Sequence, residues 1–128
     1  MSDRTAMERT IGLYFKAING DDASIVPLAD DVVLCGPMQP EPITGEAAVR
    51  QYIVDIAPFV ARWVEKFSVI EGDSAAVILE FEGLNGIIIE GAEFFRVRDG
   101  KICHIQNFFD TRKLIQGANS STGRDHQL

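Results

Sequence analysis

Two long apolar runs, joined by an Asn-Gly pair, constrain the fold more than any other part of the sequence. They are AAVILEFEGL at 75–84 and IIIEGAEFFRV at 87–97, with Asn85-Gly86 between them. An Asn-Gly pair flanked by such runs is a strong signal of a two-residue β-hairpin. The sequence therefore predicts two long antiparallel strands in the second half of the chain.

The register of this hairpin decides which of its four glutamates share a face. A two-residue turn at Asn85-Gly86 fixes the strand pairs, and directly paired residues project to the same face of a sheet. This register groups Glu80, Glu82 and Glu93 and places Glu90 on the opposite face. In an apolar pocket, carboxyl groups so close together cannot all ionise, so at least one would keep its proton at neutral pH.

The last strand, KICHIQNFF at 101–109, has two possible registers after the turn at 98–100. We favour a three-residue turn with a bulge at Gly100, because it leaves the polar His104 and Gln106 together on the face opposite the glutamate cluster. The two registers place on the cluster's face either Ile102, His104, Gln106 and Phe108, or Cys103, Ile105, Asn107 and Phe109.

Helical periodicity marks the first half of the chain. A capping box at Thr5-x-x-Glu8 opens a helix that closes at Asn19-Gly20, and Thr44 caps a second helix over 46–57. The remaining expected elements are a short helix within 21–31, a strand at 32–35, a proline-rich loop at 36–45 and a strand at 61–70. Helices followed by an antiparallel meander indicate an α+β domain over 1–116, with a disordered tail at 117–128.

Composition excludes several classes of partner. The formal net charge of −7 argues against binding to nucleic acid or to an anionic membrane surface. No apolar run approaches the roughly 18 residues of a membrane span, and the polar start has no signal-peptide core, so we expect a cytoplasmic protein. Cys35 and Cys103 are expected to be buried thiols, with no metal site.

Both faces of the expected sheet are apolar, so both need a cover. The helices can cover one face. We expect a second copy of the chain to cover the other, which gives a homodimer through the outer face of the sheet. Trp63 and Phe67 would suit that interface, although a place in the ordinary core explains them equally well.

Beyond these patterns, the chain resembles a known fold family over about residues 5–115. The segments that carry the resemblance are NGDDASIVPLADD, the proline-rich loop GPMQPEPITG and the final VRDGKICHIQNFFD. They resemble the nuclear-transport-factor-like, or SnoaL-like, superfamily, which includes ketosteroid isomerase, limonene epoxide hydrolase and polyketide cyclases. The resemblance implies a cystatin-like α+β cone, a curved antiparallel sheet wrapped around N-terminal helices, and an activity without a cofactor.

The limonene epoxide hydrolases resemble the chain most. By that similarity, their catalytic arginine falls on Glu80, their acid on Glu82 and their base on Asn107. Their water-holding tyrosine and asparagine fall on Leu34 and Gly36. In the comparison with ketosteroid isomerase, Tyr14 matches the helix-one tyrosine, Glu93 falls on the neutral acid, and the base falls on Gly36. In each comparison, only some of the catalytic positions carry a residue of the same chemical type in this chain.

Two functions follow as hypotheses. The first is a small enzyme that acts on a compact hydrophobic molecule, with Glu80 or Glu82 as the base, Glu93 and Tyr14 as hydrogen-bond donors, and Asn107 orienting the substrate. The expected apolar wall consists of Phe59, Val64, Ile78, Leu84, Ile89, Phe95, Ile105 and Phe109. The second is a ligand-binding or scaffold domain without catalysis. If the glutamate cluster faces away from the helices, it is a solvated or interfacial face.

Overall fold

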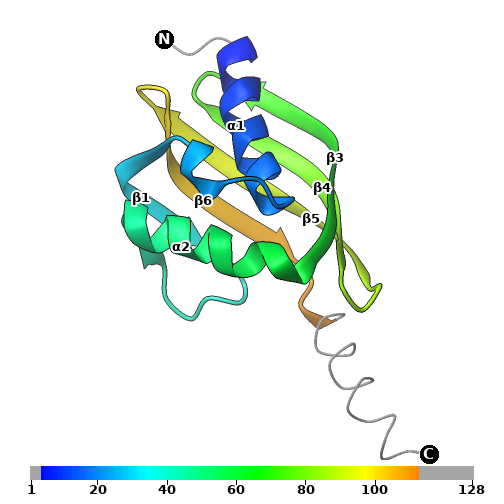
Figure 1. Cartoon of the computed structure of the whole chain (residues 1–128). Coiled ribbons are helices and arrows are strands. Elements are labelled where there is room, and N and C mark those ends of the chain that lie inside the picture. Colours follow the sequence, from blue (N-terminus) through cyan, green and yellow to red (C-terminus); the bar gives the residue numbers. More distant parts are fainter. Residues whose placement is uncertain (1–3, 113–128) are drawn as a thin grey trace, which may run out of the picture.

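The computed structural model describes residues 4–112 as two helices packed inside one curved sheet (Figure 1). The expected boundary near 116 and the tail at 117–128 lie outside the described residues. The elements are α1 (Arg4–Ile18), η1 (Ala23–Ile25), β1 (Leu28–Cys35), β2 (Ile43–Thr44), α2 (Glu46–Ile56), η2 (Ala57–Phe59), β3 (Val60–Glu71), β4 (Ser74–Gly83), β5 (Ile88–Arg98) and β6 (Lys101–Phe109).

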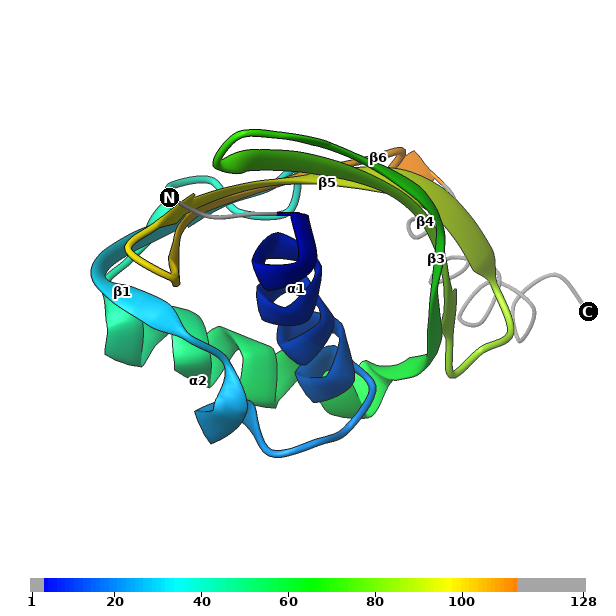
Figure 2. The same cartoon turned by 90° about the horizontal axis from the view of Figure 1, so that it is seen from above.

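The sheet has six strands in the order β2-β1-β6-β5-β4-β3. All neighbours are antiparallel except β1 and β6, which run parallel, so the sheet is mixed. Its strands curve around α1 and α2, and both helices lie on the concave side (Figure 2). The expected α+β cone is confirmed, with β1 as a parallel addition to the meander.

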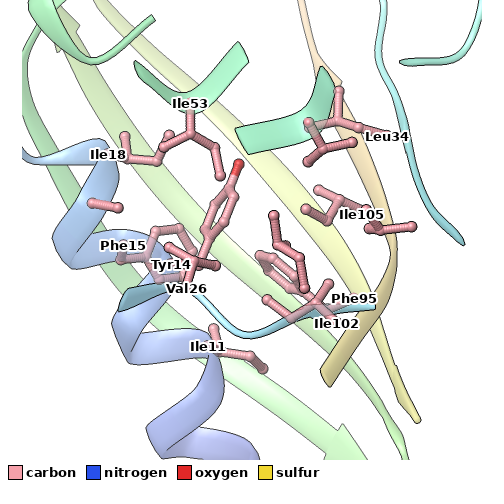
Figure 3. Close-up of a cluster of buried hydrophobic side chains, with 14 of the residues drawn as sticks. Ile11, Tyr14, Phe15, Ile18, Val26, Leu34, Ile53, Phe95, Ile102 and Ile105 are labelled. Atoms are coloured by element: carbon pink, nitrogen blue, oxygen red, sulfur yellow. The ribbon is translucent and has the colours of Figure 1, made fainter. Parts of the chain in front are cut away.

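The core fills the space between the helices and the concave face (Figure 3). Tyr14 reaches from α1 into this cluster, where its ring meets Phe95 edge to face, with the centroids 5.2 Å apart. From α2, Val49 and Ile53 are fully buried. The apolar side chains at helical spacing on the two helices and those at alternate positions on four strands therefore pack into one core.

The hairpin register is the main correction to the sequence analysis. The turn holds three residues, not two: Gly83 donates to the carbonyl of Ile87 at 3.0 Å, and the amide of Ile87 donates to the side chain of Asn85. Gly86 adopts a φ of +83°, the left-handed residue that such three-residue turns require. The pairing therefore shifts by one residue, and a shift of one residue moves side chains to the other face.

The shift separates the expected glutamate cluster. Glu80 pairs with Glu90, and Glu82 pairs with Ile88, so these three glutamates lie on the convex face of the sheet. Glu93 pairs with Val77 and projects to the concave face. The expected grouping of Glu80 and Glu82 with Glu93 is therefore wrong.

Two bulges also set side-chain directions. The turn before β6 holds only Asp99 and Gly100, both at positive φ, and the extra residue is Cys103, between the pairs Val97–Ile102 and Arg96–His104. The expected face for Ile105, Asn107 and Phe109 is correct, but the bulge lies at Cys103 and not at Gly100. A bulge between Glu65 and Phe67 turns Trp63 to the concave face and Phe67 to the convex one.

Smaller differences concern the start of α2 and the first strand. Gly45, and not Thr44, is the N-cap of α2, and no side chain caps that end. The segment expected as a short helix within 21–31 contains only η1, and β1 already begins at Leu28. No helix among the described residues is both long and apolar enough to cross a membrane.

Candidate ligand pocket

A cavity of about 430 Å³ opens at one end of the cone, between α1, α2 and the concave sheet face. Its aromatic wall is continuous: Trp63 and Phe81 stack with their ring planes 15° apart, and Phe109 meets Phe81 edge to face. The lining residues are Tyr14, Ile18, Met38, Gln39, Tyr52, Ile56, Phe59, Val60, Trp63, Phe81, Gly83, Leu84, Asn85, Asn107 and Phe109. None of them carries a charge, which suits an apolar, neutral ligand.

Tyr14 links this cavity to a buried carboxyl group. Its hydroxyl lies 3.0 Å from Oε2 of Glu93, in a hydrogen bond that joins α1 to β5. Tyr14 lines the cavity, whereas Glu93 does not, so Tyr14 is the member of the pair that borders the cavity. Both side chains are almost fully buried, at 1% and 2% exposure.

Burial keeps this pair neutral. Desolvation raises the pKa of Glu93 to about 8, and the hydrogen bond from Tyr14 opposes only part of that rise. Burial, and then the nearby Glu93, also hold the pKa of Tyr14 well above its ordinary value. At neutral pH most of the Glu93 population therefore carries its proton, and the group can donate a hydrogen bond.

Asn107 completes the polar end of the site. It pairs directly with Glu93 across β5 and β6, so the two side chains project side by side from the concave face. Oε1 of Glu93 and Oδ1 of Asn107 are both buried, and neither has a hydrogen-bond partner among the described residues. Two buried acceptors without donors on paired side chains fit a protonated Glu93, because a carboxyl proton turns one of them into a donor.

The structure brings together three of the five residues expected to act in catalysis, Tyr14, Glu93 and Asn107. The other two, Glu80 and Glu82, lie on the convex face, where they face Arg62 at 3.8 and 3.5 Å. Lys66 approaches Glu80 at 3.6 Å. Neither acid can reach a ligand in the cavity, because the sheet lies between them.

The expected apolar wall is correct only in part. Phe59, Leu84 and Phe109 line the cavity. Three other expected members, Ile89, Phe95 and Ile105, are buried but do not line it. The remaining two, Val64 and Ile78, pair with residues of the convex face.

Several lining residues were not identified from the sequence. Trp63 and Phe81 form a direct pair across β3 and β4, and only the true hairpin register would have placed them inside. Tyr52 lies on the apolar stripe of α2, and a hydrogen bond with Gln39 partly offsets the rise that burial causes in its pKa. Gln39 and Met38 come from the proline-rich loop, where no periodicity predicts side-chain direction.

Within residues 4–112, no group of three or more His, Cys, Asp or Glu side chains is arranged to hold a metal ion. Cys35 and Cys103 are free thiols, each half-buried rather than fully buried as expected. The donor set at the polar end of the cavity consists of a phenol, an acid and an amide. These groups suit hydrogen bonding to an organic oxygen better than coordination of a cation.

Residues 2–123 match the model of a protein family described as a domain of unknown function, DUF4904. The chain belongs to this family. No curated protein shows significant sequence similarity to it. The DUF4904 chain therefore has a family without an assigned activity, and its chemistry has to be inferred from its own side chains.

Solved structures place the DUF4904 chain in the NTF2-like fold. An NTF2-like protein of unknown function from Cytophaga hutchinsonii ATCC 33406 superposes with a TM-score of 0.71 at 19% identity, over 90% of this chain and 99% of that one. A protein from Kribbella flavida DSM 17836, provisionally named a ketosteroid isomerase, superposes with a TM-score of 0.74 at 24% identity, over 86% of this chain and 82% of that one. A provisional polyketide cyclase from Sinorhizobium meliloti superposes with a TM-score of 0.68 at 20% identity, over 80% of this chain and 97% of that one. At these identities the likeness shows the fold alone.

Proposed function

We propose that this protein binds a compact, neutral and largely apolar molecule in the cone cavity, and holds one oxygen of that molecule with Tyr14. This proposal rests on the Tyr14–Glu93 hydrogen bond beside a cavity whose lining is largely apolar and carries no charge. Such cavities gain affinity from apolar contact and orientation from a few polar groups.

The state of Glu93 controls what Tyr14 offers to a ligand. A protonated carboxyl accepts a hydrogen bond more weakly than a carboxylate does, so the phenolic hydrogen of Tyr14 is free to turn to a carbonyl or epoxide oxygen in the cavity. An ionised carboxylate can only accept, so it holds the phenolic hydrogen for itself. Because the pKa of Glu93 is about 8, the protonated form, which holds the phenolic hydrogen less strongly, prevails at neutral pH.

Trp63, the single tryptophan of the chain, lines the cavity and allows a direct binding test. Its fluorescence should change saturably with menthone, a neutral ketone. The matched hydrocarbon p-menthane tests apolar contact alone, and a carboxylate on the same skeleton tests charge. Tyr14→Phe should weaken menthone binding about 3- to 10-fold and leave p-menthane unchanged, because one hydrogen bond is lost. Equal menthone affinity in wild type and Tyr14→Phe would refute the role of the hydroxyl.

Catalysis is the second candidate, and the raised pKa of Glu93 favours it. A protonated acid beside a tyrosine can stabilise an oxyanion that develops on a substrate, which is the acid half of an isomerase, cyclase or epoxide hydrolase. Among the described residues the basic half has no evident source: Glu80 and Glu82 lie outside, and Asn107, at the epoxide hydrolase base position, cannot accept a proton at neutral pH. The geometry therefore supports binding better than turnover.

A turnover panel separates the two candidates. Terpene epoxides test hydrolysis, and unsaturated ketones in D₂O test proton abstraction through deuterium incorporation followed by NMR. The comparison is between wild type and Glu93→Gln, with Glu82→Gln as the control from the convex face. Turnover that falls at least tenfold in Glu93→Gln alone would establish a catalyst. Tight binding without turnover would establish the binding domain.

A further inference from the structure

Three exposed apolar side chains border the mouth of the cavity. Met38, Phe59 and Leu84 line the cavity, yet they are exposed at 53%, 66% and 68%. They come from three separate segments, the 36–42 loop, η2 and the turn between β4 and β5, which lie toward the same end of the molecule (Figure 1). Single exposed apolar residues are ordinary, but these three form an apolar rim that continues the wall of the cavity.

The apolar rim lies far from the hydrogen-bonding end of the cavity. Glu93, which is bonded to Tyr14, pairs with Val77 on β4, and Gly83 at the end of β4 lines the cavity. The strand advances six residues from Val77 to Gly83, which is at most on the order of 20 Å. A monocyclic ketone held by Tyr14 is too short to cover the apolar rim as well.

The wall between these two ends is apolar and aromatic. Phe81 lies on β4 between Val77 and Gly83, its ring stacks on Trp63 from β3, and Phe109 meets it edge to face. None of the residues that line the cavity is charged. A hydrocarbon chain can therefore follow this wall from Tyr14 to the mouth without burying a charge beside it.

We propose that the ligand has two parts: a head with one oxygen beside Tyr14, and an unbranched apolar chain that leaves the cavity across the apolar rim. This inference rests on the proposed binding function, and it narrows the ligand to neutral long-chain carbonyl compounds. The chain shields Met38, Phe59 and Leu84 from water, so part of the binding free energy comes from outside the enclosed cavity.

A series of methyl ketones tests the dependence on chain length. Trp63 fluorescence gives the dissociation constant for each member from 2-heptanone to 2-tridecanone, with menthone as the cyclic reference. Each added methylene should tighten binding by up to about fourfold inside the cavity, and by about twofold at the rim, where it is shielded on one side only. Affinity should therefore keep rising through 2-tridecanone.

Variants of the apolar rim separate a chain that crosses the mouth from one that ends inside. The test protein is the double variant Phe59→Ser/Leu84→Ser. The matched control is Val54→Ser on α2, which removes a side chain that is 49% exposed and does not line the cavity. The double variant should bind 2-tridecanone on the order of tenfold more weakly, because the contact of a few methylenes is lost. Its affinity for 2-heptanone should stay within about twofold, and Val54→Ser should bind both ketones as wild type does.

Two results would overturn the two-part ligand while leaving the proposed binding function intact. One is an affinity that stops rising while the ketone is still too short to reach the apolar rim. The other is an equal loss of affinity for 2-heptanone and 2-tridecanone in the double variant, which would make the rim an ordinary part of the cavity wall. If neither menthone nor any methyl ketone binds wild type, both proposals fail. Circular dichroism confirms that each variant is folded, which is expected because all three altered side chains are exposed.

Discussion

Glu93 and Asn107 occupy directly paired positions on β5 and β6, and each has one buried oxygen that no donor within residues 4–112 reaches. A buried acceptor without a donor on each of two paired side chains is unfavourable unless Glu93 carries a proton that makes one of them a donor. The raised pKa of Glu93 supplies that proton at neutral pH. The polar end of the cavity is consistent with an uncharged Tyr14–Glu93–Asn107 network.

The first prediction concerns stability against pH. The carboxyl group of Glu93 releases its proton at about 8 in the folded chain and near the ordinary value of 4.5 when unfolded. Between these values the folded state holds the extra proton, so the free energy of unfolding falls as pH rises from 4.5 to 8. The loss should be on the order of a few kcal/mol. Urea denaturation at a series of pH values measures it.

Glu93→Gln provides the matched variant for that experiment. Glutamine stays neutral, accepts a hydrogen bond from Tyr14 and can donate one to Asn107. The difference between wild type and Glu93→Gln should therefore change across pH 4.5 to 8, in favour of the variant at the alkaline end. A difference independent of pH would mean that Glu93 ionises normally.

The second prediction concerns Tyr14→Phe. The hydrogen bond from Tyr14 lowers the pKa of Glu93, so its removal should raise that pKa further. The free energy of unfolding should fall by about 1–3 kcal/mol, because Oε2 of Glu93 loses its buried donor. A ¹³C NMR titration of the Glu93 side-chain carboxyl carbon reads the first effect. A pKa that moves toward 4.5 would contradict the geometry.

The third prediction concerns the acids of the convex face. Glu82→Gln should leave the affinity for a neutral ketone within about twofold of wild type, because the sheet separates this side chain from the cavity. The loss of its exposed contact with Arg62 should change stability by less than about 1 kcal/mol. Trp63 fluorescence and urea denaturation measure the two quantities. A tenfold loss of affinity would return Glu82 to the site.

The fourth prediction uses two glycines. A Cβ added at Gly91 would lie 2.7 Å from the carbonyl oxygen of Phe108 and 2.9 Å from Cβ of Phe109. Gly91→Ala should therefore destabilise the fold by about 1–3 kcal/mol, since backbone must move. Gly12, inside α1, has open space around it, so Gly12→Ala should stabilise the fold by about 0.5–1 kcal/mol. Thermal unfolding of both variants gives the comparison.

The sequence predicts the elements better than it predicts their faces. Apolar periodicity locates both main helices and the four strands of the meander, because local spacing determines them. Side-chain direction depends on the turn, and Asn85-Gly86 is compatible with both turn lengths. In the structure Asn85 lies before the left-handed Gly86 and accepts from the amide of Ile87, which lengthens the turn by one residue. The extra turn residue shifts the strand pairing by one position, so Glu80 and Glu82 project to the convex face.

Asn107 lies on the expected face for a different reason than the sequence indicates. The sequence predicts a bulge at Gly100, whereas the extra residue in the structure is Cys103. A bulge at either position exchanges the inward-facing and outward-facing side chains of the strand beyond it, so Asn107 reaches the concave face in both cases. The bulge at Glu65–Phe67 has no comparable signal in the sequence, because Trp63 and Phe67 are apolar residues that suit either face.

The absence of charge from the cavity lining, combined with a formal net charge of −7 on the chain, acts as an electrostatic filter. Carboxylated and phosphorylated metabolites would be repelled by the surface field, and none of the described lining residues is a cation that could replace their lost hydration. Uncharged compounds pay neither cost. If the proposed binding function holds, selection against charged ligands begins outside the cavity, before any side chain of the site makes contact.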